Sequence, residues 1–184
     1  MDEQYKKQMG ISQLLDYADD CRRFDREKFQ KRHADGFLLH NGPVETLRMA
    51  PLAASPTQTT SGRVVGRGQG PQWNLVVMPV KHTGRSLVSE FITVGRTENN
   101  DVVVLDYSAS KFHAFFKQNP EGGFLLQDSG SRNGTFVDGV RVPARDKGEA
   151  VEIGSGAQIR FGLVEFTFWN AAEFYNMVKK MTRR

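Results

Sequence analysis

Three short polar signatures lie in the middle of the chain, and together they could bind a phosphate group. They read Gly95-Arg96, Ser110-Lys111-Phe112-His113 and Asn133-Gly134-Thr135. They supply a guanidinium fork, a hydroxyl, an ammonium group and a side-chain amide, which suit a phosphate and the peptide that carries it. Each signature borders an apolar, β-branched or aromatic run, so we expect each to lie in a loop at the end of a strand.

Short apolar runs fill residues 73–169 and predict the strands that would position these loops. We expect strands at 73–78, 91–94, 102–105, 112–116, 124–126, 135–137, 140–142, 151–153, 159–161 and 164–168. Turn residues separate them, and Asp138-Gly139 is the strongest hairpin signal in the chain. Many short strands at near-regular spacing predict a mainly β protein built as an antiparallel β-sandwich or barrel.

The N-terminal segment, residues 1–43, predicts an amphipathic helix followed by a short strand. We place the helical region at residues 1–35, with Ser12 as a suitable N-cap, and a short apolar run follows at 37–39. Residues at helical spacing form one apolar face, namely Ile11, Leu14, Leu15, Ala18 and Cys21. This face fits either packing on the main domain or docking of a partner, including self-association, and the pattern favours neither.

Residues 44–72 are predicted to be a linker, because they are rich in Pro, Gly, Ser and Thr and carry too few apolar residues to fold. The glycine-rich stretch 66–70 is followed by Pro71 where a nucleotide-binding loop would open a helix, so we expect no nucleotide cofactor. As a hypothesis, kinase modification of Thr57, Thr59 or Thr60 could make this linker dock on the chain's own site.

Residues 170–184 predict a closing helix with a basic tail. Asn170 can cap the helix, and Glu173 stands at the capping-box position. The basic residues at 179–184 suit the C-terminal end of a helix, where positive charge is favourable.

Composition restricts the class of protein further. A chain of 184 residues predicts one domain plus additional segments. The formal charge of +4 comes from Lys and Arg scattered among acidic residues, with no aromatic stacking platform, so we expect no nucleic-acid partner. Cys21 is the single cysteine, and no apolar run reaches the roughly 18–20 residues of a membrane span, so we expect a cytoplasmic protein that does not insert into membranes.

Residues 75–168 resemble a forkhead-associated (FHA) domain, a β-sandwich family that binds phosphothreonine peptides. Four ordered blocks carry the resemblance, namely Gly95-Arg96, Asn100-Asp101-Val102, 110–114 and 128–139. The chain departs from the family pattern at Gly154-Ser155, where an acidic residue is usual after the glycine, and at Asp138-Gly139, where Asn-Gly is usual. Neither departure falls on the expected phosphate site.

The resemblance implies a site in which Arg96, Ser110 and Asn133 hold the phosphopeptide, with Lys111 and Arg132 in supporting roles. Arg96 would clasp two phosphate oxygens, Ser110 would donate its hydroxyl, and Asn133 would pair with the ligand backbone. Residues expected to support the site structurally are Gly95, His113 and Gly134. The implied partner is a Thr-phosphorylated protein, such as a Ser/Thr kinase or its substrate.

Two other functions have less support in the sequence. A phosphate-independent adaptor would use the same sandwich with inert loops, but such loops would have no need for Arg96, Ser110 and Asn133 together. An enzyme would need His113 as a base, and no third orienting group is evident, so we expect no catalysis. The remaining histidines, His33, His40 and His82, fit no metal spacing, so we expect no metal.

Overall fold

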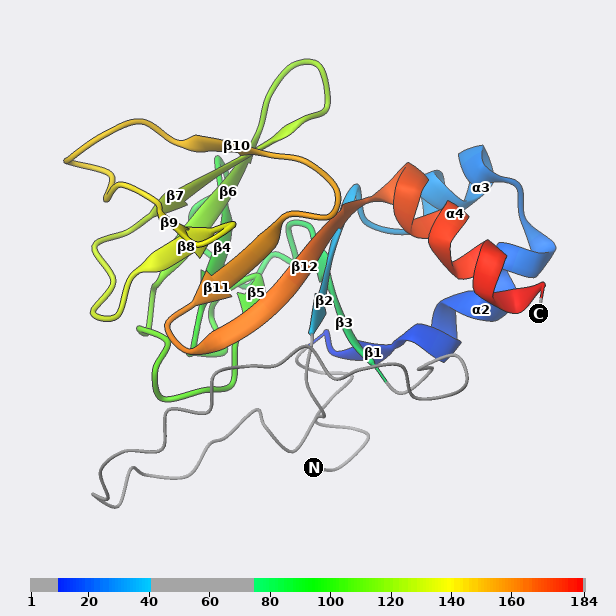
Figure 1. The fold of residues 1–184 in the computed structure, drawn as a ribbon, viewed down its shortest axis with the longest axis horizontal. Coiled ribbons are helices and arrows are strands. Elements are labelled where there is room, and N and C mark those ends of the chain that lie inside the picture. Colours follow the sequence, from blue (N-terminus) through cyan, green and yellow to red (C-terminus); the bar gives the residue numbers. More distant parts are fainter. Residues whose placement is uncertain (1–9, 41–74, 184) are drawn as a thin grey trace.

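Two β-sheets pack face to face in the computed structural model, which describes residues 10–40 and 75–183 (Figure 1). The larger sheet has seven strands in the order β1-β3-β2-β12-β11-β8-β9, and the smaller has five in the order β10-β7-β6-β4-β5. All neighbouring strands are antiparallel except β4 and β5, which are parallel. The antiparallel β-sandwich predicted from the sequence is confirmed.

The elements have the following bounds. The larger sheet contains β1 (Ser12–Gln13), β3 (Val76–Val80), β2 (Gly36–His40), β12 (Val164–Asn170), β11 (Gln158–Phe161), β8 (Thr135–Val137) and β9 (Val140–Arg141). The smaller contains β10 (Val151–Ile153), β7 (Phe124–Asp128), β6 (Ala114–Gln118), β4 (Ile92–Gly95) and β5 (Val102–Val103). The helices are α2 (Leu14–Arg23), α3 (Arg26–Arg32) and α4 (Ala171–Thr182).

The core between the sheets is built largely from phenylalanine. The fully buried rings of both sheets include Phe116, Phe124, Phe161, Phe166 and Phe168. Phe116 lies 6.3 Å from Phe161 and 6.2 Å from Phe168 between ring centroids, so the two sheets meet through aromatic contacts. Burying a side chain of this size contributes about 1.5–3 kcal/mol, so these rings are a main source of stabilisation of the sandwich.

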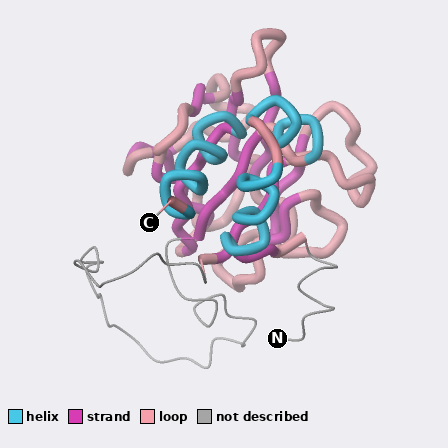
Figure 2. Tube along the Cα trace, turned by 90° about the vertical axis from the view of Figure 1, so that its right-hand side faces the viewer, coloured by secondary structure: helices cyan, strands magenta, loops and turns pink. Residues whose placement is uncertain are grey.

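A second core joins the helices to the outer face of the larger sheet. Along β2 the side chains alternate, so Leu38 faces the sandwich core while Phe37 and Leu39 face the helices. The Phe37 ring stacks on Phe174 of α4 with centroids 4.1 Å apart. Figure 2 shows the helices lying across the strands of this sheet. Because β2 is buried on both faces, its three central residues, 37–39, are all apolar, and the alternation that normally marks a strand is lost.

The N-terminal segment differs from the single long helix predicted at residues 1–35. Ser12 is not the N-cap but lies in strand β1, and α2 begins after Gln13, whose backbone N–H donates to Asp16 Oδ2 at 2.7 Å. A second helix, α3, starts after Asp25, whose carboxylate accepts the Lys28 N–H at 2.9 Å. Residues 1–9 lie outside the described residues.

The apolar face of α2 is also shifted from the one predicted. Leu15 is wrong as a member, because its side chain is 51% exposed. Tyr17 is buried in its place, next to Leu14, Ala18 and Cys21. The buried residues follow the i, i+3, i+4, i+7 spacing of one helix face, and Leu15 is turned about 100° away from Leu14.

The two terminal segments are joined to the sandwich by sheet pairing and by helix contacts. Strand β2 pairs with both β3 and β12, so the larger sheet contains strands that precede the range 73–169. Tyr175 of α4 donates its hydroxyl to the Phe24 carbonyl at 2.9 Å, which ties the end of α2 to the C-terminal helix. Pairing between such distant segments leaves no local sequence signal. The predicted linker at 44–72 lies entirely within residues 41–74, which the structure does not describe.

Two local predictions are confirmed. Asp138 and Gly139 have φ angles of 51° and 81°, as a tight hairpin turn requires at both central positions. Asn170 caps α4 by accepting the Glu173 N–H at 2.9 Å. Among the described residues, no helix combines the length and the apolar character that crossing a membrane requires.

Candidate phosphopeptide site

The three polar signatures meet around the loop that connects β5 to β6. The backbone N–H of Arg96 donates to the carbonyl of Ser110 at 2.9 Å. From the loop between β7 and β8, the backbone N–H of Arg132 donates to Ser110 Oγ at 3.0 Å, and Asn133 Nδ2 donates to the Ser108 carbonyl at 2.7 Å. Segments that are far apart in sequence therefore share one end of the sandwich.

Arg96 is held by the same loop but keeps part of its guanidinium free. Its Nε donates to the Ala109 carbonyl at 3.3 Å, and its Cζ lies 5.2 Å from the centroid of the Tyr107 ring. These contacts fix the side chain without using the two terminal nitrogens. No Asp or Glu among the described residues forms an ion pair with Arg96. A half-exposed guanidinium in this state can take an external anion with its fork.

Gly95 allows the Arg96 and Ser110 loops to touch. A Cβ at position 95 would overlap the Lys111 carbonyl oxygen and would lie 2.9 Å from the Lys111 carbonyl carbon. That carbonyl also accepts hydrogen bonds from Asn100 Nδ2 at 2.8 Å and Thr97 Oγ1 at 2.9 Å. The backbone of Lys111 is thus fixed between these donors, whereas its side chain is exposed.

His113 is buried beneath the site and bridges two of its loops. Its Nδ1 accepts the backbone N–H of Ser110 at 2.9 Å, so Nε2 carries the proton and donates to the Gly134 carbonyl at 3.2 Å. Burial lowers the pKa of His113, although the bond to Gly134 and the charge of Asp128 act in the opposite direction. Since its acceptor nitrogen faces a backbone amide and not the Ser110 hydroxyl, His113 is not arranged as a base for that hydroxyl.

A buried carboxylate organises the loop that carries Arg132 and Asn133. Asp128 Oδ1 accepts the N–H groups of Gly130 and Ser131, at 2.8 and 2.9 Å. Its Oδ2 accepts the hydroxyls of Ser131 and Thr135, at 2.6 and 2.7 Å. Burial raises the pKa of Asp128, but these hydrogen bonds outweigh it and leave the pKa below its ordinary value.

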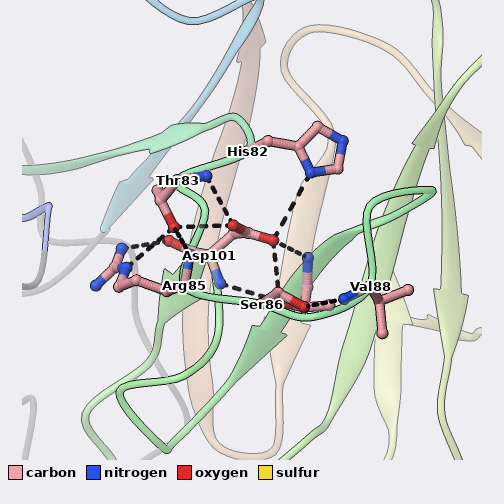
Figure 3. Close-up of polar contacts among 7 residues, drawn as sticks. His82, Thr83, Arg85, Ser86, Val88 and Asp101 are labelled. Atoms are coloured by element: carbon pink, nitrogen blue, oxygen red, sulfur yellow. Dashed lines mark hydrogen bonds and ion pairs between the residues drawn. The ribbon is translucent and has the colours of Figure 1, made fainter.

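A second buried carboxylate, Asp101, fixes the loop that starts at Arg96 (Figure 3). Its Oδ1 accepts the N–H and hydroxyl of Thr83, both at 2.8 Å, and its Oδ2 accepts the same two groups of Thr93, both at 3.0 Å. Arg85 Nη2 donates to the Asp101 carbonyl at 2.7 Å. Burial raises the pKa of Asp101, and the hydrogen bonds to Thr93 and Thr83 more than compensate, so the net pKa is lowered.

A family comparison identifies the fold that carries this site. The model of the FHA domain family matches residues 92–162, which include all three signatures. The chain contains an FHA domain. An ABC transporter ATP-binding/permease protein of Mycobacterium tuberculosis is 34% identical over 107 residues, which cover 57% of this chain and 12% of that protein. This chain therefore spans only a small part of that relative's length.

Solved structures that are similar to this chain include two phosphopeptide complexes. One is Mycobacterium tuberculosis EmbR in complex with a low-affinity phosphopeptide, with a TM-score of 0.43, 23% identity and coverage of 74% of this chain and 25% of that one. Another is the N-terminal FHA domain of S. cerevisiae Rad53p in complex with a phosphothreonine peptide, with a TM-score of 0.43, 18% identity and coverage of 55% and 89%.

Within this FHA domain, the predicted site residues divide into two groups. Arg96, Ser110 and Asn133 are joined through the β5–β6 loop, and Gly95, His113 and Gly134 lie directly behind them. The side chains of Lys111 and Arg132 are exposed, and neither forms an ion pair within the described ranges 10–40 and 75–183. They border the site as unpaired positive charges.

Ser108 joins two loops at the site and was not predicted from the sequence. Ser108 is buried, its carbonyl accepts Asn133 Nδ2, and its Oγ accepts the N–H of Leu163 at 2.9 Å. Nothing in its own neighbourhood marks this role, because its partners come from distant loops. The role of Asp128 was within reach, since Asp followed by Ser-Gly-Ser is a sequence that favours an Asx-type turn. Among the described residues, no group of His, Cys, Asp or Glu could hold a metal ion.

Proposed function

We propose that this FHA domain binds peptides that carry phosphothreonine and that the chain acts as a signalling adaptor. The observation that carries the proposal is the state of the side chains of Arg96, Ser110 and Asn133. Each side chain makes one hydrogen bond to the described residues and keeps further hydrogen-bonding capacity for a ligand. The expected partner is a protein modified by a Ser/Thr kinase, or such a kinase itself.

The phosphate would be held by charge and by donated hydrogen bonds. A phosphothreonine carries about −1.5 to −2 charges at neutral pH and offers three acceptor oxygens. Arg96 has two terminal nitrogens for a bidentate contact. Because Ser110 Oγ already accepts the Arg132 N–H, its own proton remains to be donated. Lys111 and Arg132 add exposed positive charge beside the phosphate, and this part of the binding should weaken with salt.

Asn133 would hold the peptide backbone next to the modified residue. One hydrogen of Nδ2 is bonded to the Ser108 carbonyl, which fixes the amide plane. The Oδ1 atom and the second Nδ2 hydrogen then offer an acceptor and a donor, the pair that an extended peptide backbone needs.

We assign binding and not catalysis to these residues. His113 is not directed as a base at the Ser110 hydroxyl, because it uses both ring nitrogens on backbone groups. The phosphate-independent adaptor remains the alternative. In that case the side chains of Arg96 and Asn133 would be irrelevant to partner binding. The cytoplasmic location expected from the sequence stays a prediction.

The test is a fluorescence-anisotropy titration of the full chain with three peptides. They carry Thr, phosphoserine or phosphothreonine at one position and are otherwise identical. Loss of one charge-assisted contact of about 1.5–3 kcal/mol corresponds to roughly 10- to 150-fold in affinity, which we expect for Arg96→Ala. Arg96→Lys should also bind more weakly, because an ammonium group cannot make the bidentate contact. The matched control is Lys117→Ala, an exposed residue of β6 outside the site. Equal affinity for Thr and phosphothreonine peptides would refute the proposal.

A further inference from the structure

A row of three side chains crosses the outer face of the larger sheet beside the site. Arg141 of β9 pairs in register with Phe136 of β8, and Phe136 pairs with Arg160 of β11. The residues on either side of Phe136 and Arg160 along their strands are buried, namely Thr135, Val137, Ile159 and Phe161. Since successive side chains of a strand point to opposite faces, Phe136 and Arg160 face away from the core, and so does Arg141 opposite Phe136.

Arg160 is held in a fixed position on this face. Its Cζ lies 3.8 Å from the centroid of the Phe136 ring, and its Nη1 donates to the Gly162 carbonyl at 2.5 Å. Stacking and one hydrogen bond restrict the side chain but leave further N–H groups of the guanidinium unused. A side chain ordered in advance loses little entropy when it binds an anion.

Arg141 connects this row to the phosphate site. A Cβ on Gly134 would lie 3.2 Å from Arg141 Nε and 3.3 Å from its Cζ, so the guanidinium passes directly over that glycine. Gly134 follows Asn133, and its carbonyl accepts the Gly162 N–H at 3.1 Å. The two arginines thus flank the junction of Gly134 and Gly162, adjacent to the residue proposed to hold the peptide backbone.

Neither guanidinium is neutralised by an acidic side chain of residues 10–40 or 75–183. No Asp or Glu in the described part of the chain forms an ion pair with Arg141 or Arg160. Glu165 pairs in register with Arg160 but makes no ion pair with it. The ordinary explanation for exposed arginines is solubility. That explanation does not account for the hydrogen bond and close stacking that order Arg160.

We propose that Arg141 and Arg160 form a second anion subsite, which binds the carboxylate of an Asp or Glu in the same peptide. The subsite rests on the proposed function, since the peptide must first be held at Arg96 and Asn133. A bound peptide that runs from Asn133 towards Gly134 and Gly162 would pass the guanidinium groups of Arg141 and Arg160. The preferred ligand is therefore a phosphothreonine peptide with an acidic residue on one side of the modified threonine.

The experiment is a Glu scan in a phosphothreonine peptide, measured by fluorescence anisotropy with the full chain. At each position flanking the phosphothreonine in turn, a peptide with Glu is compared with a peptide that carries the neutral isostere Gln. From the strength of exposed ion pairs, we expect Glu to bind about two- to fivefold more tightly than Gln at one or two positions on one side. The Glu/Gln ratio is the affinity for the Glu peptide divided by the affinity for the matching Gln peptide. In the variants Arg160→Gln and Arg141→Gln this ratio should fall towards one, while the affinity for the all-Gln peptide stays the same.

Arg145→Gln is the matched control. Arg145 also lies over aromatic rings, with its Cζ 5.6 Å from Phe91, which precedes β4, and 5.9 Å from Phe115 of β6 in the smaller sheet. Its loss should leave the Glu/Gln ratio unchanged. Arg160→Lys keeps the charge without the fork and should retain part of the ratio, provided that its melting temperature matches the wild type. The subsite is refuted if no position prefers Glu, or if the preference survives in both Arg→Gln variants. If instead the site at Arg96 and Asn133 did not bind phosphothreonine, the affinities for the Thr and phosphothreonine peptides would be equal.

Discussion

The backbone N–H of Arg132 donates a hydrogen bond to Ser110 Oγ across two loops of the sandwich. This contact gives one hydroxyl two tasks. As an acceptor it ties the β7–β8 loop to the β5–β6 loop, and as a donor it remains free for a phosphate oxygen. Removing the hydroxyl should therefore disturb both loop alignment and ligand binding.

The first prediction concerns Ser110. Ser110→Ala should weaken phosphothreonine-peptide binding by roughly 10-fold or more, because a charge-assisted donor and a loop contact are lost together. Ser110→Thr keeps the hydroxyl and should lose clearly less. Isothermal titration calorimetry with one phosphopeptide measures both variants. Equal losses for Ala and Thr would show that the hydroxyl is not the important group.

The second prediction concerns the glycine that lets two loops meet. Gly95→Ala places a methyl group against the Lys111 carbonyl, which is backbone and cannot move aside cheaply. Overpacking of this kind costs about 1–3 kcal/mol in the free energy of unfolding, and the Arg96 loop should move away from Ser110. Both the urea midpoint and the peptide affinity should fall.

Gly154→Ala is the control for this substitution. No atom lies within 4 Å of a Cβ at position 154, so the added methyl group meets open space. Its urea midpoint should stay close to the wild-type value. If Gly95→Ala behaves like Gly154→Ala, the close approach of the two loops does not constrain position 95.

The third prediction is a loss of stability in mild acid. Burial lowers the pKa of His113 from its ordinary 6.5, and burial also lowers that of His33. Both histidines are therefore neutral in the folded state over a range where the unfolded chain already binds protons. Their contribution to stability is complete above about pH 6.5 and is lost as the pH falls towards the folded-state pKa values.

Urea unfolding at pH 7 and pH 5 measures this effect. The free energy of unfolding should be lower at pH 5, and the difference should shrink in His113→Gln and in His33→Gln. His113→Gln should also be less stable at both pH values, because the bond to Gly134 or to Ser110 is lost. A pH difference that is identical in the wild type and both variants would contradict the assignment.

Local chemistry made most of the sandwich predictable from the sequence, and long-range pairing explains most of what was missed. The Asp138-Gly139 turn and the Asn170 cap are recognisable because the residues that form them are neighbours in the chain. Strand β2 was recognised as a short apolar run, but its place between β3 and β12 depends on partners about 40 and 130 positions away. The exposure of Leu15 follows from the turn of the helix relative to the sheet, which the apolar pattern alone leaves undecided.

The same distinction applies to the site. Arg96, Ser110 and Asn133 could be proposed before any geometry was known, because their residue types suit a phosphate and the resemblance to the FHA family implies them. Ser108 could not be selected in this way. Its function is to accept bonds from Asn133 and Leu163, and those contacts exist only once three loops have been brought together by the sheets.

The fourth prediction separates stability from binding at the two ends of β12. This strand begins beside the Gly162 turn at the site and ends at Asn170, which caps α4. Its seven residues span about 20 Å at 3.3 Å per residue. Phe37→Ala removes a fully buried ring stacked on Phe174 and should lower the free energy of unfolding by about 3–5 kcal/mol.

The helices lie at the end of β12 that is far from the phosphate site. The folded fraction of Phe37→Ala should therefore bind phosphothreonine peptide with wild-type affinity. Leu15→Ala removes a half-exposed side chain from the helical unit formed by α2, α3 and α4. It should change the free energy of unfolding by less than about 0.5 kcal/mol. Anisotropy titrations at a temperature where each variant is fully folded give the affinities. A parallel loss of affinity in Phe37→Ala would mean that the helical unit and the phosphate site are coupled through the larger sheet.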